Sequence, residues 1–256
     1  MNRKIDLNCD MGESYGAYRI GADEALMGWV TSANVACGYH AGDPMVMDRT
    51  VRLAIENGVG IGAHPGFPDL LGFGRRQMQL SPEEVEHSVL YQVGALAAFA
   101  RSAGADLAHV KAHGALYNMA AKDIEIARAI VRGVARASSD LILVGLAGSA
   151  LIEAAQEAGL RVASEGFADR AYNPDGTLRS RRLPGAVMKN PEQAAKQALR
   201  IARDGIVVTY TGEEISLHVD TICVHGDTPA AVEIVKAIRR ELEEAGIKVS
   251  PMGSFV

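Results

Sequence analysis

Short apolar runs alternate with longer amphipathic stretches along almost the whole chain, and this alternation constrains the fold more than any other feature. Strands that alternate with helices form parallel sheets with right-handed crossovers, because a tight hairpin cannot join parallel neighbours. The pattern therefore predicts an α/β fold. The runs with the length and apolar content of buried strands are Ile5–Cys9, Ala33–Cys37, Val59–Ala63, Leu107–Ala112, Leu141–Leu146, Arg161–Ser164 and Thr221–Val224.

Two of the intervening stretches show a clear helical period. Pro82–Ala103 and Ala230–Ala245 each repeat apolar residues every three or four positions along one face. The first has a strong start signal, with Ser81 as the cap, a proline at the first helical position and Glu84 closing a capping box. These stretches are predicted to be helices that pack on a sheet.

The chain length favours a barrel. At 256 residues the chain exceeds the usual single-domain size of about 150, but (β/α) barrels commonly reach about 250 residues in one domain. Ile206–Tyr210 and Ile215–Leu217 flank a Thr-Gly-Glu turn and favour a hairpin excursion over another barrel unit. We therefore expect an irregular (β/α) barrel of about seven parallel strands, with residues 1–256 as one domain. An open doubly wound sheet is the alternative.

Composition excludes several classes of partner. A formal net charge of −5 gives no reason to expect nucleic acid or an anionic membrane surface. The most apolar stretch, Leu141–Ile152, is shorter than the roughly 20 residues of a membrane span, and the first residues lack the apolar core of a signal peptide. Cys9, Cys37 and Cys223 form no CxxC and are expected to be buried free thiols, which favours a cytoplasmic location.

Polar side chains follow most of the predicted strands. In a parallel α/β fold the carboxyl ends of the strands share one face, so these side chains are expected to meet although they are remote in sequence. Such a concentration of histidines and carboxylates is typical of a catalytic site. The residues concerned are Asn8, Asp10 and Glu13 after the first strand, His40 and His64 after the next two, Lys111 and His113 at the fourth, Arg170 after the sixth and His225 after the last.

Structural roles compete with the catalytic interpretation at several positions. Asp43, and Asp227 or Thr228, precede prolines and have the pattern of helix N-caps. His109 lies inside a predicted strand and is expected to be a core histidine, while His87 falls outside the apolar face of its helix and is expected to be solvated.

The candidate residues suit two kinds of chemistry. Imidazole has an ordinary pKa near 6.5, so modest tuning makes it an acid or a base near pH 7. Asp10, His64 and His113 are also ligand types for a divalent metal that activates water. No HExxH motif is present, so the sequence leaves metal and metal-free chemistry open. Lys111 either binds a substrate carboxylate or forms an ion pair across the barrel.

A long polar loop follows the sixth predicted strand. Residues 170–185 contain the turn signal Asn-Pro-Asp-Gly, which favours a hairpin-like lid. Their arginines could bind carboxylate or phosphate, or simply be solvated. The chain contains no GxxxxGK[ST], GxGxxG or GxSxG motif.

Six blocks extend from the first strand almost to the C-terminus: DLNCDMGE (6–13), NVACGYHAGDP (34–44), GAHPGFPD (62–69), VKAHGALYN (110–118), EGFADRAY (165–172) and ICVHGD (222–227). Together these blocks resemble the LamB/YcsF family. The resemblance implies an irregular barrel of the glycoside hydrolase/deacetylase type. It also implies action as one component of an ATP-hydrolysing 5-oxoprolinase, which opens 5-oxo-L-proline to L-glutamate together with subunits B and C.

The chemical roles are inferred from residue type. Asp10 and His64 are expected to activate water, and His113 to act as the acid. Lys111 and Arg170 are expected to hold the substrate carboxylate or phosphoryl oxygens, with Asn8, Glu13, His40 and His225 as further substrate contacts. Two other functions stay open: a stand-alone metal-dependent deacetylase or amidohydrolase, and a ligand-binding component without catalysis.

Overall fold

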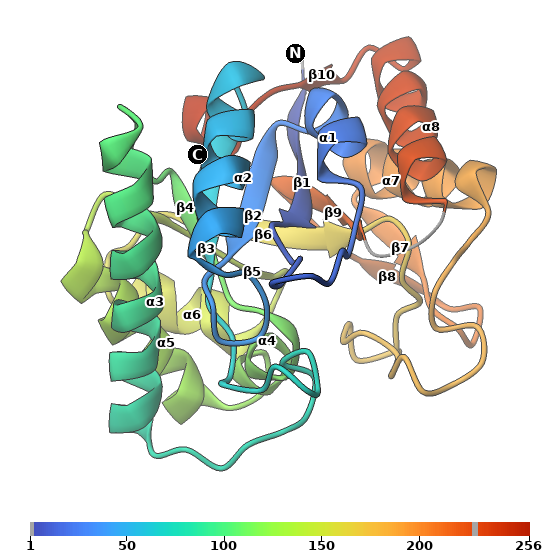
Figure 1. Ribbon diagram of the computed structural model, residues 1–256. Helices are drawn as coiled ribbons and strands as arrows, with labels where there is room; N and C mark the ends of the chain where they lie inside the picture. The colour runs from blue at the N-terminus through green and yellow to red at the C-terminus, as the bar shows by residue number, and fades with distance from the viewer. Residues whose placement is uncertain (1–2, 227–229) are drawn as a thin grey trace.

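The computed structural model describes residues 3–226 and 230–256, and its centre is a closed ring of parallel strands (Figure 1). Each strand pairs with the next along the chain, and the last one also pairs with the first. This closure confirms the irregular barrel and excludes the open doubly wound sheet. The strands are β1 (Lys4–Met11), β2 (Ser32–Ala36), β3 (Gly60–His64), β4 (His109–Lys111), β5 (Ile142–Leu146), β6 (Val162–Phe167) and β9 (Thr221–Val224).

The strand β1 closes the barrel. Its residue Cys9 pairs with Ala33 of β2 on one side and with Val224 of β9 on the other. All of β1 from Ile5 to Cys9 is buried, as expected for a strand enclosed by parallel neighbours. A further two-residue strand, β10 (Lys248–Val249), pairs with the start of β1 and was not predicted, because two residues carry no periodicity.

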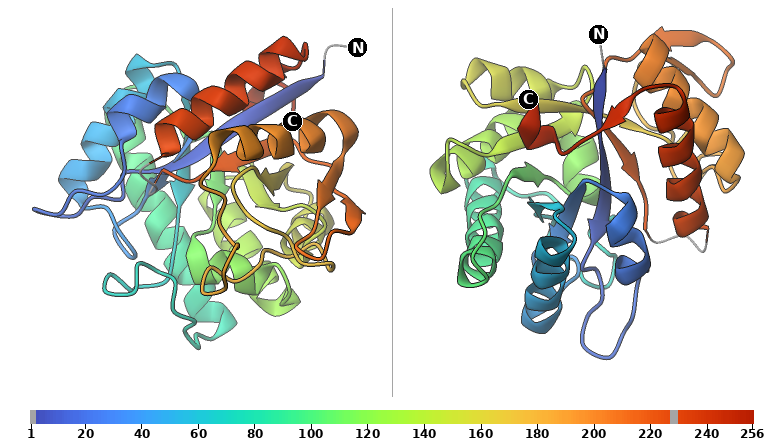
Figure 2. Two further views of the ribbon diagram at one scale, coloured as in Figure 1. Left: turned by 90° about the vertical axis from the view of Figure 1, so that its right-hand side faces the viewer. Right: turned by 90° about the horizontal axis from the view of Figure 1, so that it is seen from above.

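Helices surround the barrel, and α3 packs against α5 as α7 packs against α8 (Figure 2). The capping box at Ser81 and Glu84 is confirmed at the start of α3. The helix predicted at Ala230–Ala245 is one residue shorter at each end. The helices are α1 (Asp23–Leu26), α2 (Pro44–Glu56), α3 (Pro82–Ser102), α4 (Gly114–Ala120), α5 (Ile124–Ala137), α6 (Ala150–Glu157), α7 (Pro191–Asp204) and α8 (Ala231–Glu244), with 3₁₀ turns η1 (Met27–Trp29) and η2 (Met252–Ser254).

A short antiparallel pair stands outside the barrel. β7 (Ile206–Val208) and β8 (Glu214–Ser216) form the predicted hairpin excursion between the sixth and the seventh barrel strand. The three cysteines are buried and free, as predicted. None of the helices in the described part of the chain is long and apolar enough to cross a membrane. The N-cap predicted at Asp227 or Thr228 lies outside the described residues.

Candidate active site

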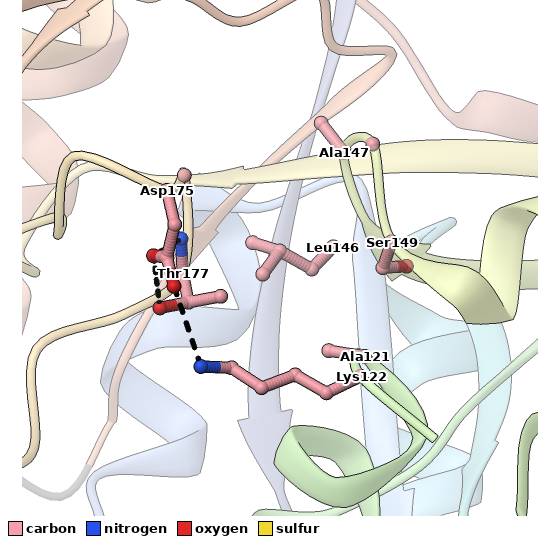
Figure 3. Close-up of a pocket in the computed structure, with 9 residues that line it drawn as sticks. Ala121, Lys122, Leu146, Ala147, Ser149, Asp175 and Thr177 are labelled. Carbon is pink, nitrogen blue, oxygen red and sulfur yellow. Dashed lines mark hydrogen bonds and ion pairs between the residues drawn. The ribbon is translucent and has the colours of Figure 1, made fainter. Parts of the chain in front are cut away.

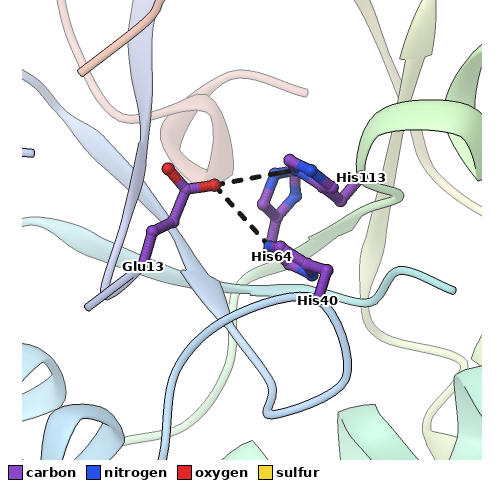
Figure 4. A group of neighbouring side chains, drawn as sticks. All are labelled: Glu13, His40, His64 and His113. Carbon is purple, nitrogen blue, oxygen red and sulfur yellow. Dashed lines mark hydrogen bonds and ion pairs between the residues drawn. The ribbon is translucent and has the colours of Figure 1, made fainter. Parts of the chain in front are cut away.

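Three of the four strand-end histidines meet in one buried cluster with a carboxylate (Figure 4). Glu13 follows β1, His40 follows β2, His64 ends β3, and His113 is the residue before α4. Each of the four is at most 5% exposed. The expectation that the carboxyl ends of the strands bring these side chains together is therefore met for this group.

Backbone carbonyls fix the orientation of two imidazoles. Nδ1 of His64 lies 2.7 Å from the carbonyl oxygen of Lys111, and Nε2 of His113 lies 2.9 Å from that of Phe73. A carbonyl oxygen only accepts, so each of these nitrogens carries the proton and donates it. The other two nitrogens, Nε2 of His64 and Nδ1 of His113, face each other at 3.0 Å.

The other two members complete the cluster from one side. The ring of His40 is stacked on that of His113, with centroids 3.8 Å apart and planes within 3°. The Oε1 atom of Glu13 lies 3.6 Å from Nε2 of His40 and 3.7 Å from Nδ1 of His113. Burial, and then neighbouring histidines, hold the pKa values of His40 and His113 well below the ordinary value, so both rings are neutral at pH 7.

Asp10 lies beside this cluster on β1. Its Oδ1 atom is 3.3 Å from Nε2 of His64 and 3.1 Å from Nζ of Lys111. Burial alone would raise the pKa of Asp10, but His64 and Lys111 outweigh it and hold that pKa well below its usual range. Asp10 is therefore ionised and placed to stabilise a proton on His64.

Lys111 occupies the interior of the barrel. Its ammonium group lies 2.8 Å from Oε1 of Glu165, 3.1 Å from Oδ1 of Asn8 and 3.1 Å from Sγ of Cys223, in addition to its contact with Asp10. Burial would lower the pKa of Lys111, yet the acidic neighbours raise it well above its ordinary value. The structure thus forms the ion pair that was the alternative to substrate binding.

Asn8 belongs to the same internal network. Its amide nitrogen donates to Oε1 of Glu165 at 2.9 Å and to the hydroxyl of Thr221 at 2.7 Å. The hydroxyl of Tyr117 donates to the other oxygen of Glu165 at 2.6 Å. Glu165 is fully buried and links β6 to three other segments, although it was not among the predicted site residues.

His225 has a different partner from the other strand-end histidines. Its Nδ1 atom lies 2.9 Å from the carboxylate of Asp169, a buried residue just after β6. Burial opposes ionisation of Asp169, but His225 lowers its pKa below the ordinary value. His225 also forms a second group of ligand-type side chains with Asp10 and Cys223, so it borders the site next to Asp10.

Arg170 is turned toward its own loop. Its guanidinium donates to the carbonyl oxygens of Ala186 at 3.2 Å and of Arg179 at 2.6 Å. Burial, followed by the charge of Arg181, lowers the pKa of Arg170 to about 10. The predicted turn is present, because the amide of Asn173 donates to the carbonyl of Thr177 at 2.7 Å.

The loop between β3 and α3 covers the histidine cluster. Phe73 contacts the rings of both His40 and His113 edge to face, and its φ of 54° makes it the one non-glycine residue with a positive φ in the described part of the chain. Asp69, which is 3% exposed, anchors this loop by an ion pair with Arg76. Sequence patterns gave no sign of this loop, because it has no periodicity and its Gly-Phe-Gly stretch resembles any tight turn.

The competing structural roles are confirmed where they can be seen. The carboxylate of Asp43 accepts from the amide of Val46 at 2.9 Å and so caps α2. His109 is fully buried and donates from Nε2 to Oδ1 of Asn34 at 2.8 Å. His87 is exposed on α3.

A separate cavity of about 240 Å³ lies beyond the end of β5 (Figure 3). Leu146, Ser149 and the turn at Asp175–Thr177 line it, and Lys122 pairs with Asp175 across it at 3.4 Å. None of the predicted site residues lines this cavity. The cavity is therefore separate from the histidine cluster.

The cluster has the composition of a metal centre. The ligand atoms of Glu13, His40, His64 and His113 all lie within 4.8 Å of one another, so the group could bind a metal ion. Imidazole nitrogens with one carboxylate oxygen are the ligand types of zinc and related ions.

Comparisons with a family model and with individual proteins assign the chain to the same family. The sequence model of the LamB/YcsF family matches residues 5–256. A protein of Pyrococcus furiosus, named as the A subunit of 5-oxoprolinase, is 57% identical over 253 residues, which covers 99% of each chain. A protein of the same name from Symbiobacterium thermophilum is 58% identical over 98% of this chain and 97% of its own.

Solved structures agree with the barrel. A crystal structure of a lactam utilization protein from Thermus thermophilus has a TM-score of 0.91 and 50% identity, covering 96% of this chain and 99% of that one. A structure described as T48 deacetylase with substrate has a TM-score of 0.51 and 16% identity over 98% of this chain and 89% of that one. The second likeness is one of fold alone.

Proposed function

Because this chain belongs to the LamB/YcsF family, we propose that it is the ring-opening component of an ATP-dependent 5-oxoprolinase. The reaction converts 5-oxo-L-proline, water and ATP to L-glutamate, ADP and phosphate. The observation that carries the proposal is the identity of 57% over nearly the full length to a protein named as the A subunit of 5-oxoprolinase. The buried acid–base cluster at the barrel mouth supports it with groups suited to hydrolysis.

The need for ATP follows from the stability of the substrate. An unstrained five-membered lactam keeps its amide resonance, which in peptides is reflected in a rotational barrier of about 18–20 kcal/mol. Phosphorylation of the lactam oxygen makes the ring carbon electrophilic. One water then adds to that carbon as the ring nitrogen leaves, and a second water releases phosphate from the resulting acyl phosphate. This chain has no GxxxxGK[ST] phosphate loop. We therefore assign activation with ATP to partner subunits B and C, and water addition to this barrel.

The hydrogen-bond directions suggest how the proton moves. Nε2 of His64 is the acceptor that takes a proton from water, because Nδ1 already donates to a backbone carbonyl. Asp10, at 3.3 Å, stabilises the resulting imidazolium. His113, whose Nδ1 is 3.0 Å from the same nitrogen, receives the proton and delivers it to the leaving lactam nitrogen. Its lowered pKa makes its protonated form a strong acid.

The remaining predicted residues divide into three kinds. Glu13 and His40 line the cluster and are proposed to contact substrate there, with His225 next to Asp10. Asn8 and Lys111 act through Asp10, since both lie in the internal network that fixes its carboxylate. Arg170 is proposed to shape the substrate entrance through the loop that it holds.

Reconstitution tests the assignment of function. The purified chain is mixed with subunits B and C, ATP and 5-oxoproline, each component is omitted in turn, and L-glutamate is measured. We expect glutamate only in the complete mixture. Glutamate formation that does not depend on this chain would remove it from the reaction.

Substitutions in the cluster test the assigned roles. Asp10→Asn and His113→Ala should each lower glutamate formation by at least about 100-fold, the scale of one general acid–base group, while the complex still assembles. His87→Ala is the matched control, because His87 is exposed on α3. Near-normal turnover in both site variants contradicts the mechanism and favours a ligand-binding component without catalysis.

A stand-alone metal-dependent deacetylase or amidohydrolase is the second candidate. The observation that favours it is the group of three histidines and one glutamate, which suits a metal-activated water. Turnover of acetylated sugars or simple amides by the isolated chain, abolished by a chelator, would select this function over ring opening.

A further inference from the structure

Two lone pairs face each other at the centre of the histidine cluster. A neutral imidazole carries one N–H and one acceptor nitrogen. In His64 and His113 the N–H groups are both used on backbone carbonyls, which leaves Nε2 of His64 and Nδ1 of His113 as acceptors. These two acceptors are only 3.0 Å apart and buried. Such a contact repels unless a positive species lies between or beside the two nitrogens.

The neighbouring side chains supply further ligands to the same point. Oε1 of Glu13 lies 3.7 Å from Nδ1 of His113 and 3.6 Å from Nε2 of His40. His40 is 1% exposed, and neither of its ring nitrogens has a hydrogen-bond partner among the described residues. A buried imidazole without a partner is costly unless a ligand completes it.

The spacing matches a small tetrahedral ion. Ligands at about 2.0–2.1 Å from a zinc-like ion in tetrahedral geometry are about 3.3 Å apart. The distances of 3.0, 3.6 and 3.7 Å between the cluster atoms bracket this value. His40 is stacked parallel to His113, so its ring must turn for both to direct a lone pair at one ion.

We propose that Glu13, His64 and His113 bind one divalent transition-metal ion of the zinc type, with His40 as the fourth ligand after its ring turns. A nitrogen-rich set with one carboxylate favours zinc, cobalt or nickel over magnesium and calcium, which prefer oxygen. The inference rests on the proposed function only for its catalytic meaning, since binding of the ion does not depend on the substrate. A nitrogen that binds the ion cannot also accept a proton, so with the ion bound Nε2 of His64 and Nδ1 of His113 would serve as ligands in place of the proton-transfer roles proposed above. Asp10, 3.3 Å from Nε2 of His64, would then remain as the acid–base group beside the ion.

The second group of ligand-type residues is less suited to a cation. Asp10 and Cys223 there both contact the ammonium of Lys111, at 3.1 Å in each case. A cation at that point faces an existing positive charge and competes with it for the same atoms. The ion is therefore placed on the His64–His113 side.

Metal binding by the full chain tests the inference without an activity assay. Metal-free protein is titrated with Zn²⁺ in a calorimeter, and the Co²⁺ form is examined for the visible absorption of a tetrahedral site. We expect one ion per chain and an increase in thermal stability on addition of Zn²⁺. Substitution of a residue that only hydrogen-bonds to a metal ligand typically lowers metal affinity by roughly 10–100-fold. His64→Ala and His113→Ala remove the ligands themselves, so we expect each to lower the affinity for Zn²⁺ by more than this.

A control variant and a folding check separate loss of metal binding from loss of the folded structure. His87→Ala should bind the ion as the wild type does, because His87 is exposed on α3. Circular dichroism checks that each variant is folded, and Glu13→Gln, which conserves size, serves if an alanine variant unfolds. A stoichiometry well below one ion per chain, or unchanged affinity in folded His113→Ala and Glu13→Gln, overturns the inference.

Failure of the metal-site inference can be distinguished from failure of the proposed ring-opening function. Glutamate formation by the reconstituted complex with metal-free protein, together with absent Zn²⁺ binding, removes the metal site and leaves ring opening. Stoichiometric binding without glutamate formation leaves the metal site and removes ring opening.

Discussion

At the scale of single residues, Lys111 shows how the interior of the barrel is organised by charge. Its side chain is 3% exposed, and its ammonium group pairs with the carboxylates of Asp10 and Glu165. Lys111→Met removes the positive charge and leaves the carboxylates of Asp10 and Glu165 without the cation that they share. We expect the free energy of unfolding to fall by about 3–5 kcal/mol, the usual cost of breaking a buried pair. Denaturant unfolding followed by circular dichroism measures it.

The chain supplies a control for this substitution. Lys122 pairs with Asp175 at 3.4 Å, but the two side chains are 61% and 58% exposed. Solvent screens such a pair, so Lys122→Met should cost less than about 1 kcal/mol. Equal losses in the two variants would contradict the ion-pair account of Lys111.

That most residues of the candidate site lie together could be predicted from the sequence, but their hydrogen-bond partners could not. A histidine at or shortly after the end of an apolar strand is visible in the sequence, so His40, His64 and His113 were predicted to meet. Which acceptor each one faces depends on barrel closure, which brings Asp169 to His225 across more than fifty positions. The role of Glu165 was likewise hidden, because its partners come from β1, β4 and α4.

At the scale of elements, the loop between β3 and α3 controls the packing of the histidine cluster. Gly74 has a φ of 62°, and a Cβ added there would lie 2.7 Å from Cβ of His40 and 2.8 Å from Cδ2 of His113. Gly74→Ala should therefore displace both rings. We expect at least a tenfold loss of glutamate formation in the reconstituted complex, in addition to a destabilisation of about 1–3 kcal/mol from backbone strain.

Gly104→Ala is a control that introduces backbone strain without displacing the rings of His40 and His113. Gly104 has a φ of 83°, but a Cβ there would meet nothing within 4 Å. The variant should show a similar loss of stability and retain normal turnover per folded molecule. If the two variants lose activity equally, the loop does not act through the histidines.

The regular elements were predictable because their signals are local. Apolar runs marked all seven barrel strands, and the capping box marked the start of α3 within the sequence itself. β10 could not be predicted from the sequence, because its two residues form a strand through pairing with the start of β1. The loop between β3 and α3 could not be predicted either. Its conformation depends on the ion pair of Asp69 and Arg76 and on contacts with histidines that are distant in sequence.

At the scale of the whole molecule, a hydrogen-bonded chain runs through the barrel and connects its stability to pH. Nε2 of His109 donates to Oδ1 of Asn34, whose amide nitrogen donates to Oδ1 of Asn8 and of Asp10. His109 fits only because residue 62 is a glycine, since a Cβ there would overlap the imidazole. A core histidine of this kind is kept neutral by its surroundings.

The sign of the pH effect follows from the direction of the pKa shift. Burial, and then the charges of Lys111 and His64, lower the pKa of His109 from 6.5 to about 3. The unfolded chain therefore binds a proton that the folded chain does not, at any pH between these values. The stability contributed by neutral His109 is complete above pH 6.5 and is lost as the pH falls toward 3, by up to about 1.4 kcal/mol per pH unit.

His109→Gln tests this linkage, because glutamine can keep a donor toward Asn34 but does not titrate. The free energy of unfolding is measured in denaturant at several values between about pH 7 and pH 4.5. We expect the wild type to lose stability more steeply than the variant, by about 1.4 kcal/mol per pH unit from this one group. His87→Gln changes an exposed histidine and should follow the wild-type slope. Parallel curves for wild type and His109→Gln would mean that His109 takes up its proton within the folded barrel, and the internal hydrogen-bonded chain would then have to rearrange rather than break.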